Sequence, residues 1–219
     1  MSIDRAGLPF IVGAVLPGAA LVLFGQAWGA LGFGVLGAFF VFFFRDPTRH
    51  PPDGDGLVLA PADGRVVVAG AVVVPDAPDG SWLQISIFLS PIDVHVNRAP
   101  IGGRIIHVER RPGRHLAAYR QTAGAENARI EVGFDIEGDT VVCRQIVGVL
   151  ARRLVCRVAP GDEVRAGDRF GIMKFGSRID LFIPRHAELL VEPGQRVRGG
   201  ETLVARLETR AAHHPAEER

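Results

Sequence analysis

The sequence has little cysteine, almost no lysine and no excess of charge of either sign. Cys143 and Cys156 are the only cysteines. Neither belongs to a C-x-x-C pattern, and no His or Cys stands at metal-ligand spacing from them. We therefore expect two reduced, strand-borne thiols and no metal site, and nothing requires an oxidising compartment. The formal net charge of +1 provides no strong global field, so nucleic acid is not an expected partner.

Charged residues are also missing from one long stretch. Residues 6–44 contain no Asp, Glu, Lys or Arg, whereas the rest of the chain has the mixed charge of a soluble domain. Two apolar runs of 17 and 18 residues, broken by a Gly-Gln pair, fill this stretch. A membrane span needs about 20 apolar residues, so each run is marginal alone, and one straight helix through both is too long. We expect residues 1–45 to form a hydrophobic helical hairpin ahead of a β domain of residues 46–219.

The residues that flank the hairpin favour the cytoplasmic side of the cell membrane. Arg5 precedes it, and Arg45, Arg49 and His50 follow it; basic flanks prefer the cytoplasm. The hairpin either spans the bilayer twice or dips into one leaflet, so the protein is hairpin-anchored or peripheral. A cleaved signal peptide fits poorly, because the apolar stretch is too long and the leading segment carries one basic residue, offset by Asp4. A buried helix pair in a soluble core is the remaining alternative, although soluble helices are rarely free of charge on every face.

Short β-type runs dominate the chain after residue 57. They are punctuated by Gly, Pro and Asp, as strands joined by tight turns are, and helical periodicity favours only two short helices, at 115–122 and 147–155. The sequence therefore predicts a mainly β (α+β) fold built on an antiparallel sheet. The expected strands are 64–70, 83–89, 128–134, 140–146 and 189–191.

Two segments of this domain are imperfect copies of each other. Residues 158–171 and 191–204 share the pattern P-G-x-x-V-x-x-G-[DE], in which each Gly suits a tight turn. Such repeats resemble the barrel-sandwich hybrid of biotinyl and lipoyl carrier domains, which present a lysine at a hairpin tip. Lys174 is the only lysine here, and it is followed by Phe-Gly-Ser rather than placed at an obvious tip. A non-enzymatic carrier or binding module therefore stays open as an alternative.

Taken singly, none of the candidate catalytic motifs is specific. Ala-Asp-Gly around Asp63 is typical of a turn with a hydrogen-bonding aspartate. His95 lies in a short alternating segment, where a structural histidine is common, although histidine is also the usual general base near neutral pH. Gly176-Ser177 is a frequent loop dipeptide. A function can be inferred only from the motifs together.

In this order and spacing, the motifs resemble phosphatidylserine decarboxylases over nearly the whole chain. The resemblance is greatest to the short form of that family, which carries an N-terminal hydrophobic hairpin and cleaves itself at a Gly-Ser bond. The stretches that carry it are Phe-Phe-Arg-Asp-Pro (43–47), Ala-Pro-Ala-Asp-Gly-Arg (60–65), Phe-Leu-Ser-Pro-Ile-Asp-Val-His-Val-Asn-Arg-Ala-Pro (88–100), Glu-Asn-Ala-Arg (126–129), Gly-Val-Leu-Ala-Arg-Arg (148–153) and Lys-Phe-Gly-Ser-Arg-Ile-Asp-Leu-Phe-Ile-Pro (174–184).

The resemblance implies a zymogen that cuts its own chain between Gly176 and Ser177. Ser177 would attack the carbonyl of Gly176, with His95 as base and Asp63 orienting His95, as in a serine-protease triad. Gly176 suits this position because it lacks a Cβ and tolerates strained backbone geometry. β-Elimination and loss of ammonia would leave Ser177 as a pyruvoyl group at the start of a smaller C-terminal chain. This chain forms a heterodimer with the larger N-terminal chain, and a higher homo-oligomer stays open.

The implied reaction is the decarboxylation of phosphatidylserine to phosphatidylethanolamine and CO2, a step of phospholipid biosynthesis. The covalent pyruvoyl cofactor would form a Schiff base with the substrate amine and accept the electrons released with CO2. His95 would then protonate the product carbon. Other serine-headgroup lipids, including an ether-linked analogue, remain alternative substrates. A soluble amino acid is a further alternative, but the charge-free hairpin argues against it, because a soluble substrate requires no membrane anchor.

Substrate recognition is less specific in the sequence. Arg98 stands where long-form members of the family carry a second histidine, which leaves its role open. Arg110, Arg111 and Arg114 belong to a basic stretch around Pro112-Gly113, which suits a lipid phosphate, an anionic membrane surface or simply a solvated loop.

Overall fold

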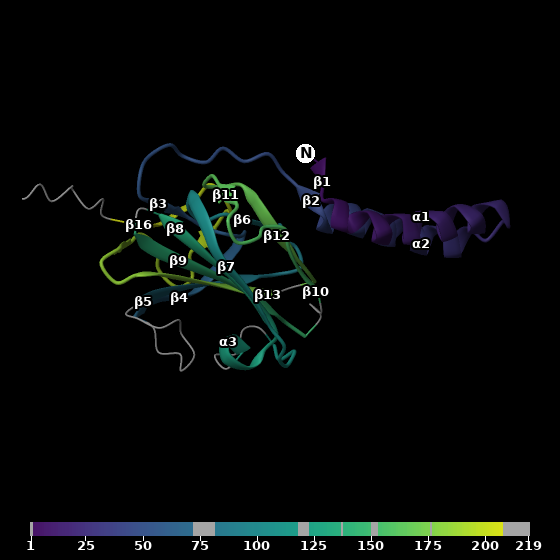
Figure 1. Cartoon of the computed structure of the whole chain (residues 1–219). Coiled ribbons are helices and arrows are strands. Elements are labelled where there is room, and N and C mark those ends of the chain that lie inside the picture. The colour runs from purple at the N-terminus through teal and green to yellow at the C-terminus, as the bar shows by residue number, and fades with distance from the viewer. Residues whose placement is uncertain are drawn as a thin grey trace, which may run out of the picture.

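The structure is a computed structural model, and it describes residues 2–71, 82–117, 123–136, 138–149, 153–175 and 177–207, with Ser177 described by its backbone alone. It consists of a β domain and a pair of helices that projects from one side of that domain (Figure 1). The expected mainly β fold with an N-terminal apolar helical hairpin is thus confirmed.

The hairpin is made of two antiparallel helices of nearly equal length. A 3-10 turn (η1, Arg5–Gly7) leads into α1 (Leu8–Leu23), and α2 (Ala27–Phe43) returns toward the domain. Gly25 has a φ of 69° and allows the tight turn between them. The helices approach closely where Gly18 faces Phe33, since a Cβ on Gly18 would lie 3.1 Å from the Phe33 Cβ. Small residues therefore allow the two helices to pack together.

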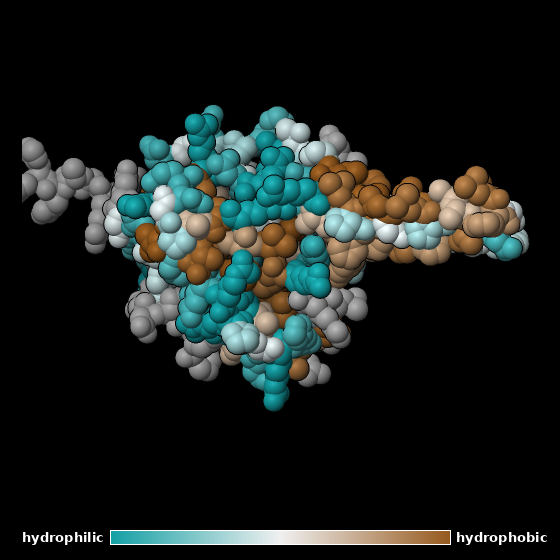
Figure 2. Space-filling model, turned by 45° about the vertical axis from the view of Figure 1, so that its right-hand side comes forward, coloured by the Kyte–Doolittle hydropathy of each residue, from teal (hydrophilic) through white to brown (hydrophobic). Residues whose placement is uncertain are grey.

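Apolar side chains cover most of the face of the hairpin that Figure 2 shows. Leu23 and Trp28, near its tip, are 86% and 87% exposed. Among the described residues, the segment Arg5–Leu23 is long and apolar enough to cross a membrane by length and composition, while Ala27–Phe43 is shorter. A soluble protein rarely exposes an apolar surface of this extent without a partner for it.

Polar and aromatic contacts fix the base of the hairpin to the domain. The short strand β1 (Ser2–Ile3) pairs with β2 (Arg45–Asp46), and Arg157 from the domain donates to both carboxylate oxygens of Asp4 at 2.7 and 2.6 Å. Phe43 and Phe44 are completely buried in a cluster that also contains domain residues such as Ile172. The hairpin is therefore part of the folded body at its base.

The β domain is built around one antiparallel eight-stranded sheet with the order β11-β7-β8-β9-β13-β5-β4-β15, curled into a half-barrel around the apolar core. Two three-stranded sheets, β10-β12-β6 and β14-β16-β3, complete it. The bounds are β3 Leu57–Leu59, β4 Gly64–Ala71, β5 Trp82–Leu89, β6 Val96–Arg98, β7 Gly103–Arg111, α3 Ala123–Glu126, β8 Arg129–Ile136, β9 Asp139–Val147, β10 Arg153–Cys156, β11 Glu163–Val164, β12 Arg169–Lys174, β13 Ser177–Pro184, β14 Glu188–Leu189, β15 Arg196–Val197 and β16 Leu203–Arg206.

The two copies of the P-G-x-x-V-x-x-G pattern form equivalent structures at opposite edges of the large sheet. The first contributes β11, which pairs with β7, and the second contributes β15, which pairs with β4. Their glycines adopt matching left-handed conformations, with φ of 83° at Gly167 and 76° at Gly200. A Cβ on Gly200 would lie 3.5 Å from the Cα of Gly167, so the curl of the sheet brings the two turns into contact.

The five strands expected from the sequence are present, with small shifts of their ends. The helix expected at 147–155 is wrong, because this segment contains the last residue of β9 and the first three residues of β10. In a run this short, helical and strand periodicity cannot be distinguished from the sequence. The helix expected at 115–122 lies mostly outside the described residues. Of the two thiols, Cys143 is buried in β9 and Cys156 half-buried in β10, both as free cysteines.

Candidate active site

The chain passes from one sheet to another at the expected cleavage site. β12 belongs to the three-stranded sheet beside the hairpin, and β13 is a central strand of the large sheet. Only Phe175 and Gly176 separate them, and Gly176 lies outside the described residues. The backbone of Ser177 begins β13, where it is in register with Leu89 on one side and Val147 on the other.

Phe175 has a left-handed backbone conformation with a φ of 70°, the one non-glycine residue of positive φ in the described part of the chain. This conformation is strained for a bulky side chain. The Phe175 ring stacks on Phe43 with centroids 4.9 Å apart and packs edge-on against Phe10 at 5.6 Å. Aromatic residues of the hairpin therefore hold the backbone immediately before the expected cleavage site in an unusual geometry.

His95 is buried in the same region. Its ring lies 4.1 Å, centroid to centroid, from the ring of Phe43, and its carbonyl accepts a hydrogen bond from the Met173 amide at 3.1 Å. One aromatic ring, Phe43, therefore contacts both His95 and Phe175. The tertiary fold brings the expected base and the segment that precedes Ser177 together, although they are far apart in the sequence.

The hydrogen bond at Nδ1 defines the form of the His95 ring. Nδ1 lies 2.9 Å from the carbonyl oxygen of Asp93, and since a carbonyl only accepts, Nδ1 carries the proton. Nε2 is then the basic nitrogen of the neutral ring. Burial lowers the pKa of His95 to about 4, against a smaller opposing effect of the hydrogen bond to Asp93, and the nearby charge of Arg45 lowers it further. His95 is thus neutral at physiological pH and able to accept a proton.

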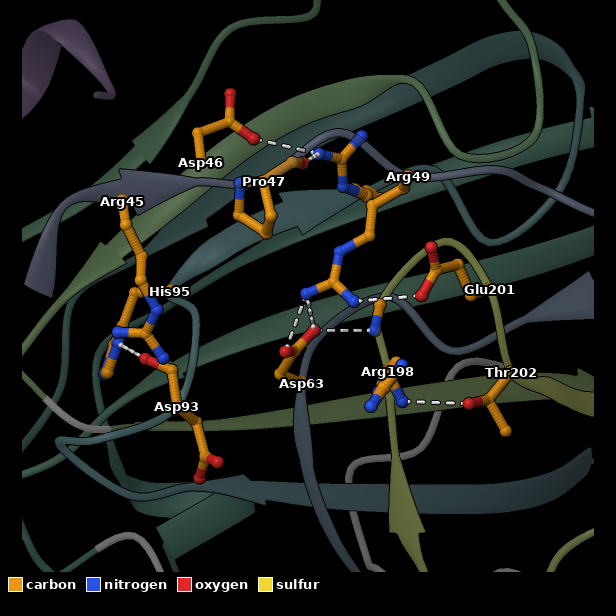
Figure 3. A network of polar contacts seen from close by, with 12 residues as sticks. Arg45, Asp46, Pro47, Arg49, Asp63, Asp93, His95, Arg198, Glu201 and Thr202 are labelled. Atoms are coloured by element: carbon orange, nitrogen blue, oxygen red, sulfur yellow. Dashed lines mark hydrogen bonds and ion pairs between the residues drawn. The ribbon is translucent and has the colours of Figure 1, made fainter. Parts of the chain in front are cut away.

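Asp63 does not contact His95 in the described structure. Both of its carboxylate oxygens accept hydrogen bonds from Nη2 of Arg49, at 2.9 and 2.8 Å, and one also accepts from the backbone amide of Gly199 at 2.8 Å (Figure 3). Arg49 in turn donates to Glu201 at 3.0 Å. Asp63 therefore connects the segment after the hairpin to the turn of the second repeat, while the Asp93 carbonyl orients His95.

Arg45 and Asp93 are the site residues that sequence reasoning did not identify. Figure 3 shows Arg45 beside His95, and its guanidinium donates to the carbonyl of Ile92 at 2.6 Å. The carboxylate of Asp93 accepts from the amide and hydroxyl of Ser90, both at 2.8 Å, and so stabilises the turn before His95. The Asp-x-His spacing within the 88–100 stretch was the one signal for Asp93. It could not indicate the contact itself, because His95 bonds the backbone carbonyl of Asp93, and every residue has such a carbonyl.

Arg98 is buried and holds the fold together. Its guanidinium donates to the carboxylate of Asp46 at 2.9 Å and to the carbonyls of Pro47 and Gly167, both at 3.0 Å. Arg114 is exposed and paired with Glu126 at 3.2 Å. Of the arginines expected to bind substrate, these two take part in structural and surface contacts.

Arg110 and Arg111 instead line a cavity of about 660 Å³. Three further basic residues, Arg129, Arg153 and Lys174, line the same cavity, and we call it the cationic pocket. Lys174 lies at the end of β12 with its ammonium 5.1 Å from the centre of the Phe10 ring. It is not at a hairpin tip, as a carrier lysine would be.

Comparison of the sequence with known proteins identifies its family. The family model of phosphatidylserine decarboxylase matches residues 36–205. A relative from Symbiobacterium thermophilum is 45% identical over 207 residues, which is 94% of this chain and 95% of the relative. A relative from Paramagnetospirillum magneticum is 42% identical over 213 residues, 94% of this chain and 88% of the relative, and both are named phosphatidylserine decarboxylase proenzyme. The chain therefore belongs to the phosphatidylserine decarboxylase family.

Proposed function

We propose that the protein is the precursor of a membrane-bound, pyruvoyl-dependent phosphatidylserine decarboxylase. It cleaves itself between Gly176 and Ser177 and then releases CO2 from phosphatidylserine to give phosphatidylethanolamine. The observation that carries this proposal is that buried His95 and Phe175, two residues before Ser177, both pack against Phe43 at the base of an apolar hairpin. The names of the relatives, which describe proenzymes, support it.

The neutral form of His95 suits the maturation step. Its Nδ1 proton is held by the Asp93 carbonyl, so Nε2 is the nitrogen that takes the hydroxyl proton as Ser177 attacks the Gly176 carbonyl. Burial and, to a smaller extent, the nearby charge of Arg45 disfavour the protonated ring. The left-handed Phe175 contributes strain beside the bond that breaks. We assign Asp63 a positioning role through Arg49, which holds the segment that leads to Arg45.

The residues around Ser177 fit a pyruvoyl group made from it. β13 is bonded to β5 and β9 on its two sides from its first residue onward, so the new chain start stays in place after cleavage. The other new chain end is held by β12, in a different sheet, and the two chains remain one heterodimer. The pyruvoyl group supplies the electron-accepting carbonyl that the side chains of a protein lack. His95 returns a proton to the substrate carbon once CO2 has left.

The length and composition of the hairpin support a site at a bilayer. Its helices of 16 and 17 residues are about 24 and 26 Å long at about 1.5 Å per residue, slightly less than a hydrocarbon core of about 30 Å. The exposed apolar side chains have lipid as their natural surroundings. Arg5 and Arg45 flank the hairpin at its base, which favours the cytoplasmic side of the cell membrane. A lipid headgroup then reaches the site while its acyl chains remain in the bilayer.

The proposal is tested by intact mass spectrometry on purified protein, combined with release of CO2 from phosphatidylserine labelled in the serine carboxyl group. We expect two chains that separate after Gly176, with the smaller one bearing a ketone at its blocked N-terminus. Ser177→Ala should give one uncut, inactive chain. Active material with a single mass of 23.5 kDa would contradict the proposal, and so would a matured enzyme that releases no CO2.

A further inference from the structure

The cationic pocket is the strongest concentration of charge in the site region that the catalytic proposal leaves unused. Its basic side chains come from four strands or their ends, β7, β8, β10 and β12, and no acidic residue is among the described residues that line it. The whole chain has a net charge of only +1. The clustering is therefore local and not a consequence of overall composition.

The strand register places like charges directly opposite each other at this pocket. Arg153 on β10 is the partner of Lys174 on β12, and Arg111 on β7 is the partner of Arg129 on β8. Directly opposite residues of antiparallel strands project on the same face, and like charges in such pairs destabilise a sheet. Two such pairs bordering one cavity are an arrangement that an anionic ligand would stabilise.

The charges of the pocket are only partly compensated within the protein. Arg111 pairs with Glu109 at 2.8 Å, and Arg129 donates to the carbonyl of Ala125 at 2.7 Å. Within the described residues, Arg110, Arg153 and Lys174 form no ion pair. Burial lowers the pKa of Lys174, and the charge of Arg153 lowers it further. The pocket thus favours a negatively charged group.

The pocket also lies next to the reacting residue. Val147 lines it and is the register partner of Ser177 across β9 and β13. Two residues separate Lys174 from Ser177 in the chain, and the Lys174 ammonium lies against the Phe10 ring of the hairpin. A ligand in the pocket therefore lies close to the first residue of β13 and to the base of the hairpin.

We propose that the cationic pocket binds the phosphodiester of the phospholipid substrate, with Arg110, Arg153 and Lys174 as its principal cations. This inference rests on the proposed function, because it identifies the reacting lipid as the ligand. In a serine phospholipid, only Cβ and one oxygen separate the reacting Cα from the phosphorus, which matches a pocket beside Ser177. The phosphodiester carries one negative charge, suited to Arg and Lys donors.

The test compares Arg110→Gln and Arg153→Gln with the wild type. Both arginines are exposed, so the fold should tolerate the change. Intact mass first establishes that each variant is cleaved as the wild type is. Decarboxylation is then measured on dihexanoyl-phosphatidylserine dispersed as monomers, without a membrane surface. Each variant should raise KM about tenfold, the effect of losing one charge-assisted hydrogen bond, with kcat nearly unchanged.

Two further arms identify the source of the phosphate. Glycerophosphoserine, which has no acyl chains, should inhibit the wild type competitively, and its inhibition constant should rise in the variants in parallel with KM. Inorganic phosphate, in contrast, should inhibit more weakly than glycerophosphoserine. The matched control is Arg185→Gln, an exposed arginine just after β13 and outside the pocket, which should leave KM and kcat unchanged.

An unchanged KM for the monomeric substrate would overturn the proposal. If binding to vesicles containing phosphatidylglycerol fell at the same time, the pocket would be a membrane contact and not a substrate site. Binding of glycerophosphoserine to the uncut Ser177→Ala protein, with and without Arg153→Gln, keeps the test independent of maturation and turnover. Equal affinity in the two proteins would refute the pocket even if the decarboxylase function were correct.

Discussion

The neutral state of His95 can be tested quantitatively by lowering the pH. Its ring is fully buried, and burial lowers its pKa from 6.5 to about 4. At pH 5.5 a solvent-exposed histidine is about 90% protonated, whereas a group with a pKa near 4 is about 3% protonated. His95 should therefore stay neutral across the range in which an exposed histidine titrates.

The same shift makes the stability of the precursor depend on pH. The unfolded chain binds the His95 proton more tightly than the folded chain, so protons favour unfolding. The folded state keeps its full stability above pH 6.5 and loses it as the pH falls toward 4. A shift of 6.5 to about 4 corresponds to roughly 3 kcal/mol at 1.36 kcal/mol per unit. His95→Gln should remove this part of the pH dependence.

The measurement is an NMR titration of the uncut Ser177→Ala precursor in detergent, labelled with ¹³C at histidine Cε1. His95→Gln in the same background assigns the His95 signal among the seven histidines. We expect that signal to show no titration step between pH 8 and 5.5. In the wild-type chain, the rate of self-cleavage should likewise stay nearly constant from pH 8 to 6. A midpoint near 6.5 in either experiment would refute the assignment of a buried, neutral base.

Three further predictions concern the strained residue, the hairpin and the buried ion pair. Phe175→Ala removes the ring contacts that hold the left-handed backbone, so it should slow self-cleavage about tenfold. The rate is measured in a time course on denaturing gels. An unchanged rate would show that this packing does not contribute to cleavage. Leu16→Glu with Val35→Glu changes two exposed residues near the middle of α1 and α2 and should abolish co-flotation with vesicles, because each charge costs about 3 kcal/mol at the centre of a membrane helix. Cleavage should persist, and retained flotation would refute the membrane assignment. Asp46→Ala leaves the guanidinium of Arg98 buried without its carboxylate partner. It should lower the free energy of unfolding, measured by denaturant titration, by about 3–5 kcal/mol. A loss below about 1 kcal/mol would contradict a structural role for this ion pair.

The hairpin was predictable because its signal is local, whereas cleavage at Gly176-Ser177 stays a prediction that depends on all the motifs together. A charge-free stretch interrupted by Gly25 predicts two apolar helices, and both are present. The repeats predicted matching turns, which Gly167 and Gly200 form. The strands followed from short alternating runs bounded by Gly and Pro. The segment 147–155 failed because a run this short does not separate helical from strand periodicity.

The contacts of the individual site residues could not be predicted in the same way. The sequence suggested that Asp63 orients His95, but Asp63 binds Arg49 and Gly199, and the Asp93 carbonyl orients the ring. Both aspartates lie in recognisable motifs. Only their positions in space show which of them reaches the histidine.

The sequence by itself therefore determined the class of fold and the apolar hairpin, since each depends on neighbouring residues. It also pointed to Ser177 as the residue proposed to become the reactive group. The tertiary structure alone decided three other features: the neutral tautomer of His95, the left-handed Phe175 held by hairpin rings, and a pocket that collects cations from four strands. These depend on burial and on strand register, which are set by the packing of the whole chain and not by any one segment.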